Sequence, residues 1–198
     1  KLPMEMTGVA DFIGNDFSES FFVLKGSNGS GKTTYMRTLG INFLLAQCGL
    51  PVFAESFQTK LFQNIFLRFG SNDCMNEGKS SFVIELEHMN NGASRMDENS
   101  AVFIDELGCS CDCKSGKKIC DYYLKKIVDK QCVGVFASHF NFDEGVNQKE
   151  MGLLNGKYTY KIQDHGHNKS NDNAVAVAET CGLPSEILYM SERMAIKM

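Results

Sequence analysis

Apolar and polar residues alternate in blocks along the chain, and the blocks change between strand and helix patterns. Short apolar runs typical of buried strands lie at about 20–26, 64–69, 101–106, 132–138 and 157–163. Longer segments with helical spacing lie at about 32–48, 81–95, 115–130, 173–181 and 185–197. This alternation predicts an α/β fold, in which a mostly parallel sheet is flanked by helices.

A glycine-rich segment joins the first strand to the first helix. It reads GSNGSGKT and fits the phosphate-binding pattern G-x-x-x-x-G-K-[ST]. A strand that leads through such a turn into a helix presents backbone N–H groups and the positive end of the helix dipole to an anion. The segment therefore predicts a nucleotide triphosphate site, whose binding residues are Gly26, Ser27, Asn28, Gly29, Ser30, Gly31, Lys32, Thr33 and Thr34.

Four side chains are expected to act on the phosphates and on Mg²⁺. Lys32 would reach the β- and γ-phosphates, and the Thr33 hydroxyl would ligate the metal. The apolar run at about 101–106 ends in Asp105, a second metal ligand, and Glu106, which would polarise the attacking water. The alternative for the two carboxylates is an ordinary solvated turn after a strand.

Two more polar segments have both a structural and a functional interpretation. The apolar strand near 133–137 leads to His139, which either contacts the γ-phosphate or makes only a local hydrogen bond. Ser80 or Ser81 is suited to cap the next helix, with Glu85 in its first turn. The functional alternative is a helix N-terminus that faces a phosphate, such as one bound by a partner subunit.

Composition limits the other functions of the chain. The net charge is −4 over 198 residues, so we expect no direct DNA contact by this piece. There is no apolar run of about 18 residues, so we expect no transmembrane helix, and the N-terminal residues do not have the pattern of a signal peptide. Because the sequence does not begin with Met, we interpret it as a fragment of a longer chain.

The chain contains eight cysteines. Those in apolar or helical patterns are expected to be reduced and to behave as small hydrophobic residues. Cys109, Cys111 and Cys113 are spaced C-x-C-x-C, without the paired C-x-x-C spacing or an obvious fourth ligand of a metal site. We predict a plain loop here, with a metal site as the alternative.

The order of these motifs resembles the ATPase domain of the MutS family of DNA mismatch-repair proteins. The resemblance rests on the glycine-rich segment and on NIFLR at 64–68, GKSSF at 78–82, DELG at 105–108, ASH at 137–139 and the closing segment 176–184. These matches cover nearly the whole chain. We therefore interpret residues 1–198 as a single domain, the C-terminal part of a divergent, eukaryotic-type member.

The resemblance implies a P-loop NTPase fold related to ABC ATPases, in which two domains enclose two ATP molecules. Ser80 would then contact the partner's γ-phosphate, and Phe12 and Tyr160 would lie on either side of the adenine, with core packing as the alternative for both rings. The implied cofactors are ATP and Mg²⁺. The implied partners are a second MutS-like subunit and mismatched or branched double-stranded DNA, bound through domains absent here. The implied location is the nucleus, or the cytoplasm in a prokaryote, with no membrane association.

The residues after Gly108 depart from the family pattern. The family continues D-E-[IL]-G-R-G-T, whereas this chain has Cys109-Ser110-Cys111 after Gly108.

The predicted function is an ATP-binding and hydrolysing switch domain that works as a dimer. Another ABC-type ATPase subunit is one alternative, although no L-S-G-G-Q signature precedes Asp105. A nucleotide-binding pseudo-ATPase in a heterodimer is the other.

Overall fold

The computed structural model describes residues 13–69, 81–142, 145–154 and 157–166. Its strands form one six-stranded sheet in the order β2-β3-β4-β1-β5-β6, and every neighbouring pair is parallel except β5 and β6. The elements in chain order are β1 (Phe21–Lys25), α1 (Lys32–Gln47), β2 (Asn64–Arg68), α2 (Ser81–Ala93), β3 (Ser100–Asp105), α3 (Cys113–Asp129), β4 (Val133–Ala137), β5 (Gln148–Leu154) and β6 (Lys157–Asp164). The prediction of a mostly parallel sheet flanked by helices is confirmed.

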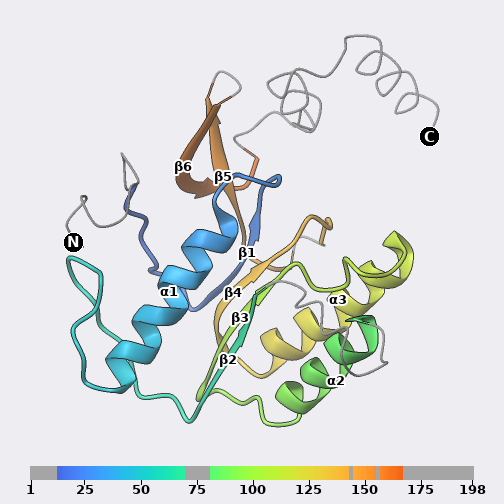
Figure 1. The fold of residues 1–198 in the computed structure, drawn as a ribbon, viewed down its shortest axis with the longest axis horizontal. Coiled ribbons are helices and arrows are strands. Elements are labelled where there is room, and N and C mark those ends of the chain that lie inside the picture. The colour runs from blue at the N-terminus through green and yellow to red at the C-terminus, as the bar shows by residue number, and fades with distance from the viewer. Residues whose placement is uncertain (1–12, 70–80, 143–144, 155–156, 167–198) are drawn as a thin grey trace.

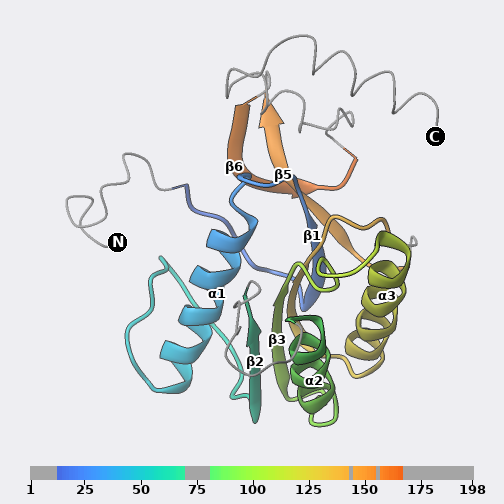
Figure 2. The same ribbon diagram turned by 45° about the vertical axis from the view of Figure 1, so that its right-hand side comes forward.

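The sheet lies between two helical layers. Helix α1 covers one face, and α2 and α3 cover the other (Figures 1 and 2). Strand β3 is buried along its whole length because both of its faces are covered. Val102 and Ile104 pack on the side of α2 and α3, whereas Ala101 and Phe103 pack on the side of α1.

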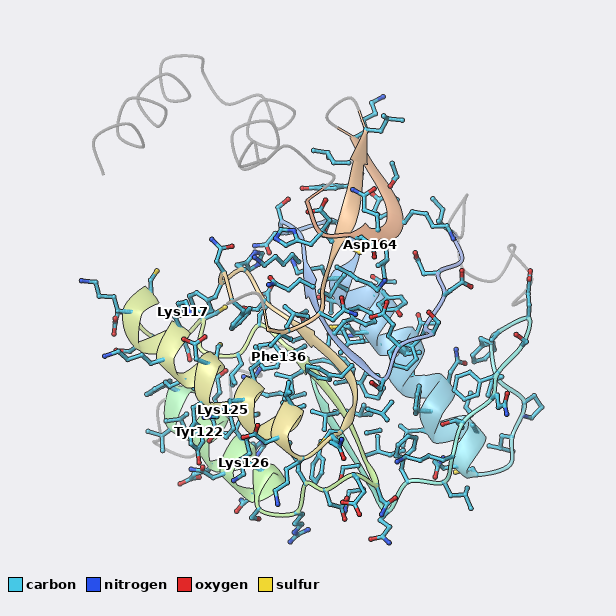
Figure 3. All side chains as sticks on the ribbon, turned by 180° about the vertical axis from the view of Figure 1, so that it is seen from behind. Lys117, Tyr122, Lys125, Lys126, Phe136 and Asp164 are labelled. Carbon is cyan, nitrogen blue, oxygen red and sulfur yellow. The ribbon has the colours of Figure 1, made fainter. Side chains whose placement is uncertain are left out.

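Each face has its own core. On the α1 side, the Phe43 ring contacts four other aromatic rings, those of Phe17, Phe57, Phe62 and Phe103. On the opposite side, Phe136 is fully buried under α3, whose lysines Lys117 and Lys125 project outward (Figure 3). The apolar residues Met36, Leu39 and Phe43 recur at helical spacing in α1, and all three are buried against the sheet.

The sequence missed one strand and assigned one side chain wrongly. Strand β5 reads QKEMGLL and lacks the apolar run of a buried strand, since only its middle residues are buried. The prediction that Glu85 supports the first turn of α2 is wrong: no acidic residue lies in that turn, and Glu85 is buried beside the sheet. The helices predicted at 173–181 and 185–197 lie outside the described residues.

Strands β3 and β4 approach each other closely at Gly134. Gly134 pairs with Val102 and has φ of 147°, a conformation that favours glycine. A Cβ atom at this position would lie 1.8 Å from the Val102 carbonyl oxygen. The Gly134 amide also donates a hydrogen bond of 2.7 Å to the Ser20 carbonyl oxygen. The pairing in the centre of the sheet thus requires a residue without a side chain.

We expect Gly134→Ala to lower the free energy of unfolding by at least about 2 kcal/mol, because it combines backbone strain with a backbone clash. Chemical denaturation would measure the change. Gly14→Ala is the matched control: a Cβ atom there would contact nothing within 4 Å, so its effect should stay within about 0.5 kcal/mol. Equal stability of the two variants would contradict the role assigned to Gly134.

Candidate functional site

The carboxyl ends of three neighbouring strands meet at one edge of the sheet. Ala137 of β4 lies beside Leu24 of β1 on one side and beside Asp105 of β3 on the other. The residues that follow these strands are therefore brought together: the glycine-rich segment 26–31, Glu106 and His139. This edge is where α/β proteins bind ligands.

The glycine-rich segment is a tight loop that leads directly into α1. Gly29 and Gly31 have φ of 80° and 96°, in the left-handed region that glycine adopts readily. Gly31 is the N-cap residue of α1, and no side chain caps the helix. The first-turn N–H groups thus need partners from outside the helix, which a phosphate oxygen could supply.

Lys32 is the charged residue of the loop, and its side chain is buried, with 3% exposure. Its ammonium donates hydrogen bonds to the Gly26 carbonyl oxygen at 2.6 Å and the Ser27 carbonyl oxygen at 3.2 Å. Glu106 Oε1 lies 3.6 Å from Lys32 Nζ. Burial lowers the pKa of Lys32, while the charges of Glu106 and Asp105 oppose that shift.

Thr33 and Asp105 form a pair of oxygen donors beside the lysine. Thr33 Oγ1 donates a 2.6 Å hydrogen bond to Asp105 Oδ2. Among the described residues, the other carboxylate oxygen, Asp105 Oδ1, is buried without a hydrogen-bond partner, and the same holds for Ser30 Oγ. A hydroxyl and a carboxylate are ligands that Mg²⁺ prefers, and an unpaired buried carboxylate oxygen is costly without such a partner. These residues therefore fit a magnesium ion at the start of α1.

Glu106 lies in a strained backbone conformation beside His139. Its φ is 52°, and its amide donates a hydrogen bond to the Ala137 carbonyl oxygen. His139 Nε2 lies 3.0 Å from Glu106 Oε1 and 3.1 Å from Asn28 Oδ1. Both oxygens are acceptors, so Nε2 carries the proton. The Glu106 side chain is one-third exposed, so water can reach its carboxylate.

Two tyrosines of β6 border the loop. The Tyr160 ring is half exposed and lies against Gly31, where a Cβ atom would be 3.1 Å from Tyr160 Cδ1. The Tyr158 hydroxyl hydrogen-bonds with Ser27 Oγ. Sequence reasoning assigned no role to Tyr158, although its spacing of two residues from Tyr160 puts both on one face of the strand.

Of the remaining predicted site residues, the structure describes Thr34 but not Phe12 or Ser80. Thr34 is exposed in the first turn of α1. Phe12 and Ser80 lie outside the described residues. The proposed adenine sandwich and the contact in trans therefore stay predictions.

Cys109 and Cys111 lie in the loop between β3 and α3, and Cys113 is the first residue of α3. Cys109 and Cys113 are exposed, and the Cys111 thiol donates to the Gly108 carbonyl oxygen at 3.2 Å. Within the described ranges, no group of three or more His, Cys, Asp or Glu side chains could hold a metal ion. The predicted lack of a metal at these cysteines stays a prediction.

The fold and the site define an α/β protein in which a glycine-rich loop and the ends of parallel strands form one polar site. The family model described as MutS domain V matches residues 22–198. The chain belongs to this family.

Two curated relatives indicate the degree of similarity. A DNA mismatch repair protein MutS from Streptococcus pyogenes serotype M18 is 30% identical over 212 residues, and one from Caldicellulosiruptor saccharolyticus is 27% identical over 213 residues. In both cases the alignment covers 98% of this chain and 24% of the relative, so the chain spans about a quarter of their length. Both relatives are bacterial, and the eukaryotic-type origin stays a prediction. None of the helices in the described residues is long and apolar enough to cross a membrane.

We expect Cys120 and Cys132 to resist alkylation in the folded protein. Burial raises the pKa of Cys120 to about 12 and that of Cys132 to about 11, so both remain thiols at pH 8. Because the thiolate is the reactive form, they should react at least about 100-fold more slowly than exposed Cys48 and Cys113. Mass-spectrometric mapping after iodoacetamide treatment would measure this. Labelling should become uniform in urea, and equal labelling of Cys120 and Cys48 in the native protein would contradict the burial.

Proposed function

We propose that this chain is the ATP-binding and hydrolysing switch domain of a MutS-like mismatch-repair or recombination protein. The observation that carries the proposal is the Thr33–Asp105 pair, which lies next to the buried Lys32 ammonium and in which Asp105 Oδ1 has no hydrogen-bond partner in the part of the chain that the structure describes. Family membership supports the assignment. The fold would be that of a P-loop NTPase related to ABC ATPases.

Nucleotide binding would use the loop in three ways. The backbone N–H groups around Gly29 and Gly31 would surround the phosphates, and the α1 dipole would favour their negative charge. Lys32 would exchange its hydrogen bonds to the Gly26 and Ser27 carbonyl oxygens for phosphate oxygens. Thr33 and Asp105 would hold Mg²⁺, which neutralises phosphate charge when bound.

Hydrolysis would depend on the Glu106 carboxylate. Its Oε1 atom accepts from His139 Nε2, which leaves Oε2 to accept a proton from the attacking water. His139 also contacts Asn28 of the loop and so would link the carboxylate to the occupied phosphate site. His139 would thus act as a sensor of the γ-phosphate, and Glu106 as the general base.

The partners follow from the family and are part of the proposal. A second MutS-like subunit would complete the site through Ser80, and Phe12 and Tyr160 would hold the adenine. Mismatched or branched DNA would bind other parts of the longer protein, located in the nucleus or in a prokaryotic cytoplasm. A pseudo-ATPase is the second candidate, because Cys109-Ser110-Cys111 stands where the family pattern has Arg-Gly-Thr.

We expect Lys32→Ala to weaken ATP binding by at least about 100-fold, because two charge-assisted contacts to the phosphates are lost. Isothermal titration calorimetry with Mg·ATP would measure the affinity. Lys125→Ala is the matched control, since Lys125 is exposed on the outer side of α3 (Figure 3), and it should bind like the wild type. Unchanged affinity in Lys32→Ala would refute the assignment of the loop.

We expect Glu106→Gln to slow hydrolysis by about 10²–10⁴-fold while ATP affinity stays nearly unchanged. The substitution keeps the shape of the side chain and removes the basic carboxylate. Single-turnover hydrolysis, with bound nucleotide quantified, separates the two effects. Hydrolysis at the wild-type rate would show that the base is another residue. A wild type that binds ATP without hydrolysing it, alone or with a partner subunit, would favour the pseudo-ATPase.

A further inference from the structure

Arg68 and Glu85 form a buried ion pair next to the end of β3. Arg68 is the last residue of β2, and Glu85 belongs to α2. Arg68 Nη2 lies 2.7 Å from Glu85 Oε1, and the two side chains are only 16% and 5% exposed. Buried charges are costly unless their remaining hydrogen-bonding groups are also satisfied. The partners of those remaining groups therefore indicate what the pair does.

The remaining hydrogen bonds of the pair reach the backbone on both sides of Glu106. Arg68 Nη1 donates to the Asp105 carbonyl oxygen at 3.0 Å. The Gly108 amide donates to Glu85 Oε1 at 3.0 Å, so the chain is held just before and just after Glu106. One further bond, 2.6 Å long, runs from Ser110 Oγ to Glu85 Oε2. The ion pair thus fixes segment 105–110 from outside the glycine-rich loop.

Glu106 needs such support because its backbone is strained. A non-glycine residue at φ of 52° persists only when the surrounding structure determines its conformation. Other contacts hold the same segment as well: the Glu106 amide donates to the Ala137 carbonyl oxygen, the Cys120 thiol donates to the Leu107 carbonyl oxygen, and Gly108 lies against Gly116 of α3. A Cβ atom on Gly108 would be 2.9 Å from the Gly116 carbonyl oxygen. The ion pair is the charged part of this support.

We propose that Arg68 and Glu85 are positioning residues for the Glu106 carboxylate, which they hold through the backbone of Asp105 and Gly108. The proposal rests on the function proposed above for Glu106. Neither side chain has a described contact with the glycine-rich loop, so the pair sets the hydrolysis rate and leaves phosphate binding to the loop. A displacement of about 1 Å in a catalytic group can lower a rate by about 100-fold.

The test uses Glu85→Gln and Arg68→Lys in the full-length protein. Glu85→Gln leaves one acceptor oxygen, whereas Arg68, Gly108 and Ser110 together use two. Arg68→Lys keeps the positive charge but loses the planar guanidinium, whose two nitrogens donate to Glu85 and to the Asp105 carbonyl oxygen. Asp121→Asn is the matched control, because Asp121 forms an ion pair with Lys117 on the exposed side of α3. Each protein is measured for thermal unfolding, ATP affinity, single-turnover hydrolysis and amide hydrogen exchange without nucleotide.

We expect hydrolysis to slow by at least about 10-fold in both variants, while ATP affinity changes by less than about 3-fold. Exchange of segment 105–110 should accelerate by about 10-fold, and Asp121→Asn should change neither quantity. Wild-type hydrolysis rates in folded variants would overturn the proposal. So would a loss of ATP affinity equal to the loss of rate, because the role would then be general structural support.

The exchange measurement separates this proposal from the proposed function. If the wild type does not hydrolyse ATP, the assignment of Glu106 as base fails, and with it the catalytic part of the proposal. Accelerated exchange would then still establish that the pair holds segment 105–110. Unchanged exchange at Gly108 in Glu85→Gln would overturn that as well. If Glu85→Gln does not fold, Arg68→Lys provides the same measurements.

Discussion

The parallel pairing of β4 with both β1 and β3 is the constraint on which the site depends. It sets the carboxyl ends of the three strands level, with Ala137 beside both Leu24 and Asp105. The close approach at Gly134 permits this pairing, because a Cβ atom there would collide with β3. The relative positions of the strand ends that form the site therefore depend on strand pairing in the centre of the sheet and not on the polar side chains of the site.

Charge at this edge is divided between two groups of residues. Lys32 at the start of α1 fits phosphate, and Asp105 at the end of β3, bonded to Thr33, fits magnesium. Arg68 and Glu85 form the second group, and they bind the backbone of Asp105 and of Gly108, respectively. Glu106 lies between the groups, since its carboxylate faces Lys32 and the backbone before and after it, at Asp105 and Gly108, bonds to Arg68 and Glu85. Because of this division, we expect substitutions in the first group to affect ATP binding and substitutions in the second group to affect the rate of hydrolysis.

Much of this arrangement was predictable from local sequence, because apolar runs and glycine spacing are local signals. An apolar run predicts the strand that ends in Asp105, and the glycine spacing predicts the loop before Lys32. Strand β5 was not predictable, since its burial comes from pairing with β1 and β6. The Arg68–Glu85 pair and the Tyr158 contact join residues far apart in the sequence, and no local pattern indicates which distant charges will meet. The roles of Phe12 and Ser80 stay predictions.

A crystal structure of the protein with Mg²⁺ and a slowly hydrolysed ATP analogue tests the central claim most directly. The account predicts that Lys32 Nζ leaves the Gly26 and Ser27 carbonyl oxygens and contacts the terminal phosphates. It also predicts a magnesium ion within ligand distance of Thr33, with Asp105 bound to it directly or through water. An analogue bound at another site would contradict the account. So would a structure at saturating analogue in which Lys32 Nζ keeps its hydrogen bonds to the loop carbonyl oxygens.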